Sequence, residues 1–391
     1  MNRTAFLLVI VLLLLPFPLC AATETVTLAA RAAGLQKRDG FIPWYWDEKR
    51  GQILLELSPA LLHHEFLYFT GLGSGIGSTE VFADRSSFGG NALSRFRRVG
   101  SQVLVTQVNA DFRAENGSTE LKRSVESSFP TSVLAALPIE AEQDGTLLVD
   151  ANRLFIRDAV DLVSQLRRPT RIVGGAMLRN EGSGANWRLD EGRSVIDLDH
   201  SGGFPLNTEI EAMLTFTSDA ESNFNQPDPH ALSIREHHSF LPLPEPGYEV
   251  REQDPRVGFF GVTFQDFSQP FDHPLTRYLI SRWRLQKKNP GAALSEPVKP
   301  IVFYLDRAIP EPVRSAAKRG ALWWNAAFEQ AGFKDVHDSE TGMGTWPKQS
   351  LVIVNEHAAH TADLLRFKKK IVDAVKAKFG LTLEQEPELL P

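Results

Sequence analysis

The chain has 391 residues, of which 42% are hydrophobic, so it is long enough for two or three domains with sizeable cores. Its formal net charge is −6 at pH 7, and its pI is near 6.0. Nucleic-acid-binding proteins normally carry a basic surplus, so this charge balance argues against a nucleic-acid partner.

The first 22 residues have the pattern of an export signal. Arg3 supplies a positive start, residues 6–15 form an apolar run, and Cys20 is followed by two alanines that suit cleavage. The run is shorter than the ~20 apolar residues of a membrane span. We expect a signal peptide over residues 1–22, a periplasmic or extracellular location, and no membrane span after cleavage. A lipoprotein attached through Cys20 is the alternative, and a chain cleaved after Ala22 would form no disulfide.

Residues 23–240 are predicted to form a β-rich domain. A hairpin is expected over Phe41–Leu57, because an aromatic segment and an alternating segment flank a charged turn that ends at Gly51. Asn116-Gly117 is a turn signal. Further strands are predicted at residues 65–70, 101–112, 147–149 and 210–217. The pattern favours a meander, barrel or sandwich, and with the later helices it indicates the α+β class.

A proline-rich connector is expected over residues 241–300, with a short helix at Arg277–Gln286. A buried strand at Ile301–Leu305 should follow, and then an amphipathic helix that begins near Pro312 and stops at Gly332. Residues 301–336 resemble the start of a metallopeptidase-like catalytic domain, and 337–347 look like a junction. The tail, 348–391, is expected to hold a strand at 350–355 and a basic helix at 361–379.

Several patterns invite a functional interpretation, and a structural one is favoured for each. The glycine run Gly71–Gly77 fits no phosphate-binding motif and is predicted to be a flexible hairpin loop. The pairs His63-His64 and His237-His238 should point to opposite sides of strands, which argues against shared metal ligation. His357 and His360 lack the order of a zinc motif, and the lysines at 368–370 favour a solvated helix face. We expect no metal site.

The chain from about residue 34 to 333 resembles secreted bacterial zinc-dependent metallopeptidases of a metzincin-like kind. The resemblance is carried by short motifs at residues 88–96, 243–248, 254–258, 264–267, 297–307 and 321–333. It implies zinc for the full family, bound in an H-E-x-x-H helix, and this motif is absent from the sequence. No zinc ligand can therefore be assigned, although a divergent zinc site built from scattered histidines is an alternative.

Residues 344–388 resemble the C-terminal end of UDP-N-acetylmuramate dehydrogenase, a flavoenzyme. Matching pieces are residues 346–355, the helix near Ala362 and Phe379–Glu386. The resemblance implies FAD for that family and a catalytic acid at the position of Glu386, although Gln385 replaces the usual proline. No flavin-binding domain or proton-transfer serine can be assigned.

These two resemblances predict a fused or truncated exported protein without complete peptidase activity and with no cofactor of its own. Two alternatives are open: a flavin-dependent reductase of which only the C-terminal substrate-binding part is present, or a non-catalytic periplasmic binding module with an unknown ligand or peptide. We also expect incomplete packing around Trp323, Trp324 and Phe328, and hence a mobile segment or an exposed apolar patch.

Overall fold

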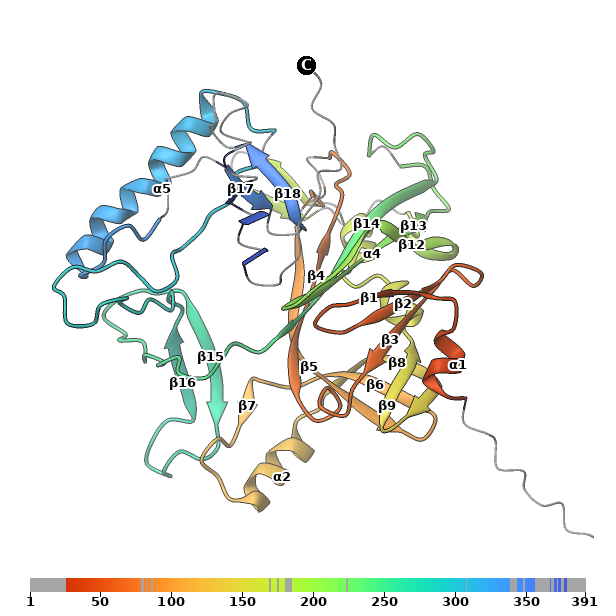
Figure 1. The fold of residues 1–391 in the computed structure, drawn as a ribbon, viewed down its shortest axis with the longest axis horizontal. Coiled ribbons are helices and arrows are strands. Elements are labelled where there is room, and N and C mark those ends of the chain that lie inside the picture. The colour runs from red at the N-terminus through yellow and green to blue at the C-terminus, as the bar shows by residue number, and fades with distance from the viewer. Residues whose placement is uncertain are drawn as a thin grey trace, which may run out of the picture. The chain divides into compact units, whose positions relative to one another are not determined.

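The computed structural model describes residues 26–337, with gaps at 79–80, 82, 86, 169, 174–175, 180–184, 223 and 307. It also describes 343–346, 349–355 and a few helical residues between 366 and 377. The predicted signal peptide, Cys20, His357, His360 and Glu386 lie outside these residues. The fold is α+β, as predicted, with one large sheet and few helices (Figure 1).

The chain divides into two compact units. The first comprises residues 1–244 and 265–275, and the second comprises 245–264 and 276–391. Each is described by itself below.

An antiparallel sheet of eleven strands forms the first unit, in the order β1-β2-β3-β9-β8-β6-β5-β4-β14-β13-β12. The strands are β1 (Gln36–Arg38), β2 (Trp44–Asp47), β3 (Gln52–Leu57), β4 (Glu65–Leu72), β5 (Phe88–Val99), β6 (Gln102–Gln107), β8 (Ser132–Gln143), β9 (Thr146–Asp150), β12 (Arg188–Phe204), β13 (Asn207–Thr217) and β14 (Ala231–Pro242). The predicted hairpin is β2–β3, with Gly51 at φ +61° in its turn. The predicted strands at 65–70, 147–149 and 210–217 are also confirmed.

The two ends of this sheet meet, which makes it a near-barrel (Figure 1). The Phe41 N–H donates to the Phe204 carbonyl at 2.8 Å, and the Thr208 hydroxyl bonds both the N–H and the carbonyl of Ile42. Gly40 and Gly203 lie at this seam: a Cβ atom on Gly203 would come within 2.1 Å of the Asp39 carbonyl oxygen. The seam therefore depends on two glycines that let the backbones approach.

Short helices inside the curve of the sheet complete the core. α3 (Asn152–Phe155) contacts β3, β8 and β13, strands far apart in the sheet order, so the sheet curls around it. α4 (Leu162–Arg167) follows, and the backbone N–H groups of Leu162 and Val163 donate to the Asp158 carboxylate at 2.7 and 2.8 Å. The core around these helices is one cluster of fully buried side chains, including Phe66, Phe96, Phe155, Phe216 and Phe240.

Other elements of the first unit were not predicted. α1 (Leu28–Ala32) is capped by Thr27, and α2 (Thr119–Ser128) is capped by Ser118, directly after the Asn116-Gly117 turn. The predicted strand 101–112 ends earlier, as β6, and only the short β7 (Phe112–Arg113) follows. β7 pairs in parallel with Gln265 and Asp266, at the end of β15 (Gly261–Asp266). The hairpin β10 (Thr170–Val173) and β11 (Ala176–Arg179) stands apart from the main sheet.

Two local predictions for the second unit are wrong. Residues 277–280 belong to a strand, β16 (Thr276–Ile280), and not to a helix; the β-branched and aromatic side chains of this segment fit a strand. Residues 301–305 form no strand, although Ile301 is buried and its N–H donates to the Val336 carbonyl at 2.8 Å. Isolated contacts of this kind order a segment without extending a sheet.

The predicted amphipathic helix is confirmed as α5 (Val313–Gln330), which ends before Gly332 at φ +87°. No residue of α5 is buried, and Trp323 and Trp324 are 79% and 64% exposed. The expected exposed apolar patch is therefore present. The predicted strand of the tail is β18 (Gln349–Asn355), which pairs with β17 (Met343–Trp346).

Candidate functional site

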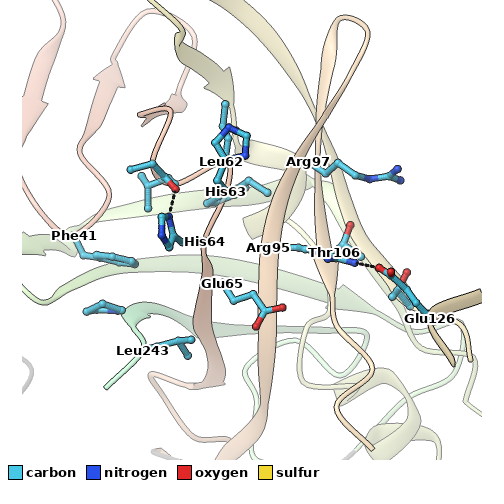
Figure 2. Close-up of a pocket in the computed structure, with 15 residues that line it drawn as sticks. Phe41, Leu62, His63, His64, Glu65, Arg95, Arg97, Thr106, Glu126 and Leu243 are labelled. Atoms are coloured by element: carbon cyan, nitrogen blue, oxygen red, sulfur yellow. Dashed lines mark hydrogen bonds and ion pairs between the residues drawn. The ribbon is translucent and has the colours of Figure 1, made fainter. Parts of the chain in front are cut away.

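A groove of about 1070 Å³ on the first unit is the candidate site (Figure 2). Phe41, His64, Glu65 and Leu243 lie on one side of β5, and the Arg95–Glu126 pair lies on the other. The full lining is Phe41, Ala60, Leu61, Leu62, His63, His64, Glu65, Arg95, Phe96, Arg97, Thr106, Glu126, Thr131, Pro242 and Leu243.

His63 and His64 both line this groove, so the prediction that they point to opposite sides of a strand is wrong. They lie in the turn before β4, where the alternation of a strand does not apply. His64 Nδ1 lies 2.8 Å from the Ala60 carbonyl oxygen, which can only accept. Nδ1 therefore carries the proton, and Nε2 of the neutral ring is left as an acceptor.

The charged side of the groove is organised by β5. Arg95 and Arg97 are two residues apart and share one face of the strand. Arg95 Nη2 donates to Glu126 of α2 at 2.9 Å, and Glu65 is the register partner of Arg95 on β4. Among the described residues, the Thr106 hydroxyl is buried without a hydrogen-bond partner, and Thr106 is only 4% exposed.

A second hollow, of about 360 Å³, adjoins the first and shares Glu65, Arg95, Glu126 and Thr131 with it. It adds Lys122 and Arg113, and Arg113 is paired with Glu115 at 3.0 Å. Neither the arginines of β5 nor Lys122 was singled out from the sequence. The Arg-x-Arg spacing on a predicted strand is the signal that could have found the arginines.

The pair His237-His238 behaves as predicted: the two rings lie on opposite faces of β14. His238 is in the core, with Nδ1 2.7 Å from the Tyr68 hydroxyl, which also accepts from Arg157 at 3.2 Å. Burial and the nearby Arg157 charge hold the pKa of His238 well below its usual range, and burial raises the pKa of Tyr68 to about 12. Both side chains are therefore neutral at physiological pH.

Glu236 shares the buried face with His238. Its Oε2 accepts from the Ala159 N–H at 2.9 Å, and the residue has no exposed surface. Burial raises the pKa of Glu236 to about 8, and the neighbouring Asp158 carboxylate adds to the rise. These contacts attach residues 157–159 to the inner face of the sheet, so this interior cluster has a structural role.

His237 faces the other way, between two carboxylates of β13. Nε2 is 2.7 Å from Glu209, and Nδ1 is 2.9 Å from Glu211. Burial lowers the pKa of His237, but hydrogen bonds to both glutamates outweigh it and raise the pKa to about 9. Gly73, in the predicted glycine loop, leaves room for this cluster, because a Cβ there would lie 2.2 Å from a Glu211 oxygen.

Metal ligation has no support among the described residues. No group of three or more histidine, cysteine, aspartate or glutamate side chains in that part of the chain could hold a metal ion. The described helices also include none long and apolar enough to cross a membrane. In the tail, Lys369 pairs with Asp373 at 2.9 Å, which agrees with a solvated helix face.

Comparison with protein families matches the part of the chain that carries the charged side of the groove to a family whose function is not known. The profile of the domain of unknown function DUF5117 matches residues 87–288, just over half of the chain. The chain belongs to the DUF5117 family. The DUF5117 match includes β5, α2 and β14, and with them Arg95, Arg97 and Glu126 of the groove.

A second profile, the C-terminal domain of UDP-N-acetylenolpyruvoylglucosamine reductase, matches residues 284–390. The reductase of Alcanivorax borkumensis is 38% identical over 104 residues, 27% of this chain and 26% of the relative. That of Xylella fastidiosa is 34% identical over 73 residues, 19% of each chain. The chain therefore spans about a quarter or less of the length of these relatives. No solved structure matches it significantly.

These matches revise the sequence interpretation. The reductase, which is also called UDP-N-acetylmuramate dehydrogenase, was expected from residue 344 onward, but its profile begins at 284 and includes α5. The segment 301–333, assigned by resemblance to a metallopeptidase, thus lies within the reductase match. The metallopeptidase resemblance and its zinc gain no support from either profile.

Proposed function

We propose that residues 284–390 are a reductase-type substrate-binding region that binds a UDP-N-acetylated sugar. The match to the C-terminal domain of UDP-N-acetylenolpyruvoylglucosamine reductase carries this proposal. Because the matched part is about a quarter of the relative's length, we propose binding and not the complete reduction. By the same resemblance, Glu386 is the residue proposed to act as the acid.

The interior of the first unit has no room for a flavin. An isoalloxazine ring needs a slot between side chains, whereas the space enclosed by the sheet is filled by Phe66, Phe96, Phe155, Phe216 and Phe240. FAD belongs to the relatives' family, and no step proposed for this chain involves it.

The meeting of the two profiles at residues 284–288 supports a chain assembled from two sources. The proposed export rests on residues 1–22.

Calorimetry on the full-length chain tests this function. UDP-N-acetylglucosamine should release heat with a Kd in the micromolar to millimolar range, because it lacks part of the reductase substrate, and UDP-glucose should bind at least about tenfold more weakly. The purified protein should be colourless. Equal affinity for both nucleotides, or none for either, would contradict the proposal, while flavin absorbance would point to a complete reductase.

We also infer that the first unit is a binding module, since the groove combines an apolar side with the cations Arg97 and Lys122, which pair with no side chain among the described residues. A panel of an N-acetylated amino acid, a disaccharide and a short fatty acid would test this. Chemical shift changes in the rings of His63 and His64, with His230 unchanged, are expected for at least one compound. Changes at His230 alone would place binding elsewhere.

A further inference from the structure

The groove contains three kinds of side chain that the described part of the chain leaves without a partner: hydrogen-bond acceptors, cations and apolar groups. Among the described residues, no side chain donates to His64 Nε2 or to the Glu65 carboxylate, and none pairs with the guanidinium of Arg97 or the ammonium of Lys122. A ligand that completes the site must therefore offer hydrogen-bond donors to one side and an anion to the other. Polar groups that lose water on binding need such partners.

The third requirement is apolar. Phe41 and Leu243 lie on the same side as His64 and Glu65 (Figure 2), and Leu61 and Leu62 line the groove beside them. These side chains call for apolar groups on the ligand, which gain free energy when they leave water. The buried, unpartnered hydroxyl of Thr106 lies on the charged side and points independently to a polar ligand group there.

The local charge of the groove determines whether it favours an anionic or a cationic ligand. The chain carries a net charge of −6, yet Arg95, Arg97 and Lys122 outnumber Glu65 and Glu126 in the two adjoining hollows, where Arg113 is neutralised by Glu115. Arg95 is held by Glu126, so Arg97 and Lys122 are the cations left for a ligand. A local cationic surplus on an acidic protein attracts and orients anions.

We propose that this groove binds an extended peptide with apolar side chains and at least one carboxylate. The backbone N–H groups of the peptide would donate to His64 Nε2 and Glu65, its apolar side chains would pack on Phe41 and Leu243, and its carboxylate would pair with Arg97. A fatty acid satisfies the last two requirements but has no N–H donor, so a peptide fits the groove better. This inference rests on the proposed binding function of the first unit and names its ligand class.

The test uses the full chain and a fluorescein-labelled octapeptide of alternating leucine and glutamate, with fluorescence anisotropy as the readout. Binding is expected, and Arg97→Glu should weaken it by at least about tenfold, since a charge-assisted hydrogen bond is lost and a repulsion added. His64→Leu should weaken it severalfold. Arg123→Glu is the matched control: Arg123 is exposed on α2 next to Lys122, lines neither hollow, and should leave the affinity unchanged.

Two further probes distinguish an error in the proposed ligand class from a failure of the groove to bind any ligand. A lysine-for-glutamate octapeptide and laurate should both bind at least about tenfold more weakly than the acidic peptide. If either binds as well, with loss on Arg97→Glu, the groove binds ligands but the peptide class is wrong. If no probe binds, or if Arg123→Glu weakens binding as much as Arg97→Glu, both the class and the binding function of the groove are overturned.

Discussion

Glu236→Gln is expected to stabilise the protein at pH 9 by on the order of 4 kcal/mol while changing little at pH 5. Burial of the carboxyl group raises the pKa of Glu236 to about 8 in the folded chain, from an ordinary value of 4.5. The folded state therefore keeps a proton that the unfolded state releases. The stability that comes from this proton is complete below pH 4.5 and is lost as the pH rises through about 8.

Glutamine is a close match for the protonated form. Its side-chain oxygen can still accept from the Ala159 N–H, but it cannot ionise, so the cost of a buried charge disappears at high pH. Urea denaturation followed by circular dichroism at pH 5, 7 and 9 would measure the effect. Glu191→Gln, at an exposed position of β12, is the control and should leave the pH profile unchanged. A Glu236→Gln profile parallel to that of the unmodified protein would show that Glu236 does not hold its proton.

The two histidines of β14 shape the rest of the pH profile. The pKa of His237 is raised to about 9, so the stability that its protonation contributes is present below pH 6.5 and is lost between pH 6.5 and about 9. His238 has a lowered pKa, so its contribution is present above 6.5 and falls as the pH drops below that value. Some loss of stability at alkaline pH should therefore persist in Glu236→Gln.

Gly203→Ala is expected to cost about 3 kcal/mol or more in the free energy of unfolding. The new Cβ would lie 2.1 Å from the Asp39 carbonyl oxygen and 3.2 Å from the Gly40 Cα, and both are backbone atoms that cannot rotate away. The two edges of the sheet would have to separate. The hydrogen bond from the Phe41 N–H to the Phe204 carbonyl would then lengthen or break.

Gly192→Ala on the same strand is the matched control. Its Cβ would meet only a flexible oxygen of Asp190, at 3.4 Å, so a change within about 0.5 kcal/mol is expected. Urea denaturation gives the free energies, and hydrogen exchange at Phe41 reports on the seam itself. Equal stability of the two variants, with Phe41 still protected, would mean that the seam does not close the sheet.

Local sequence patterns were sufficient to predict many helices and strands. They were insufficient where contacts with neighbouring strands decided between helix and strand. The alternation in 52–57 and 210–217 predicted β3 and β13, and the apolar stripe of 313–331 predicted α5, because each pattern repeats within one element. The segment 277–286 carries both helix and strand formers, and β16 shows that pairing with a neighbouring strand decided its state. The serine cap of α2 was a local signal that the Asn116-Gly117 turn obscured.

The candidate site depended more on tertiary structure. His63 and His64 were visible in the sequence, but it is the turn before β4 that lets both of them line the groove. In β14, residues 235–239 are all polar, and only the flanking Leu232, Ile234 and Phe240 indicate that the even-numbered positions face the core. Residues from β4 and α3 cover that face, so the polar side chains of Glu236 and His238 are buried there.

Composition and periodicity were thus enough to establish a β-rich region and one long amphipathic helix, and short motifs in the tail carried its resemblance to a reductase. Closure of the sheet was beyond them, because the seam joins Ile42 to Thr208, 166 residues apart, through contacts that no local repeat encodes. The groove likewise combines side chains from the two ends of the first unit, Phe41 and Leu243. Only the folded chain brings such distant residues together, and their burial there sets the pKa values on which the pH predictions rest.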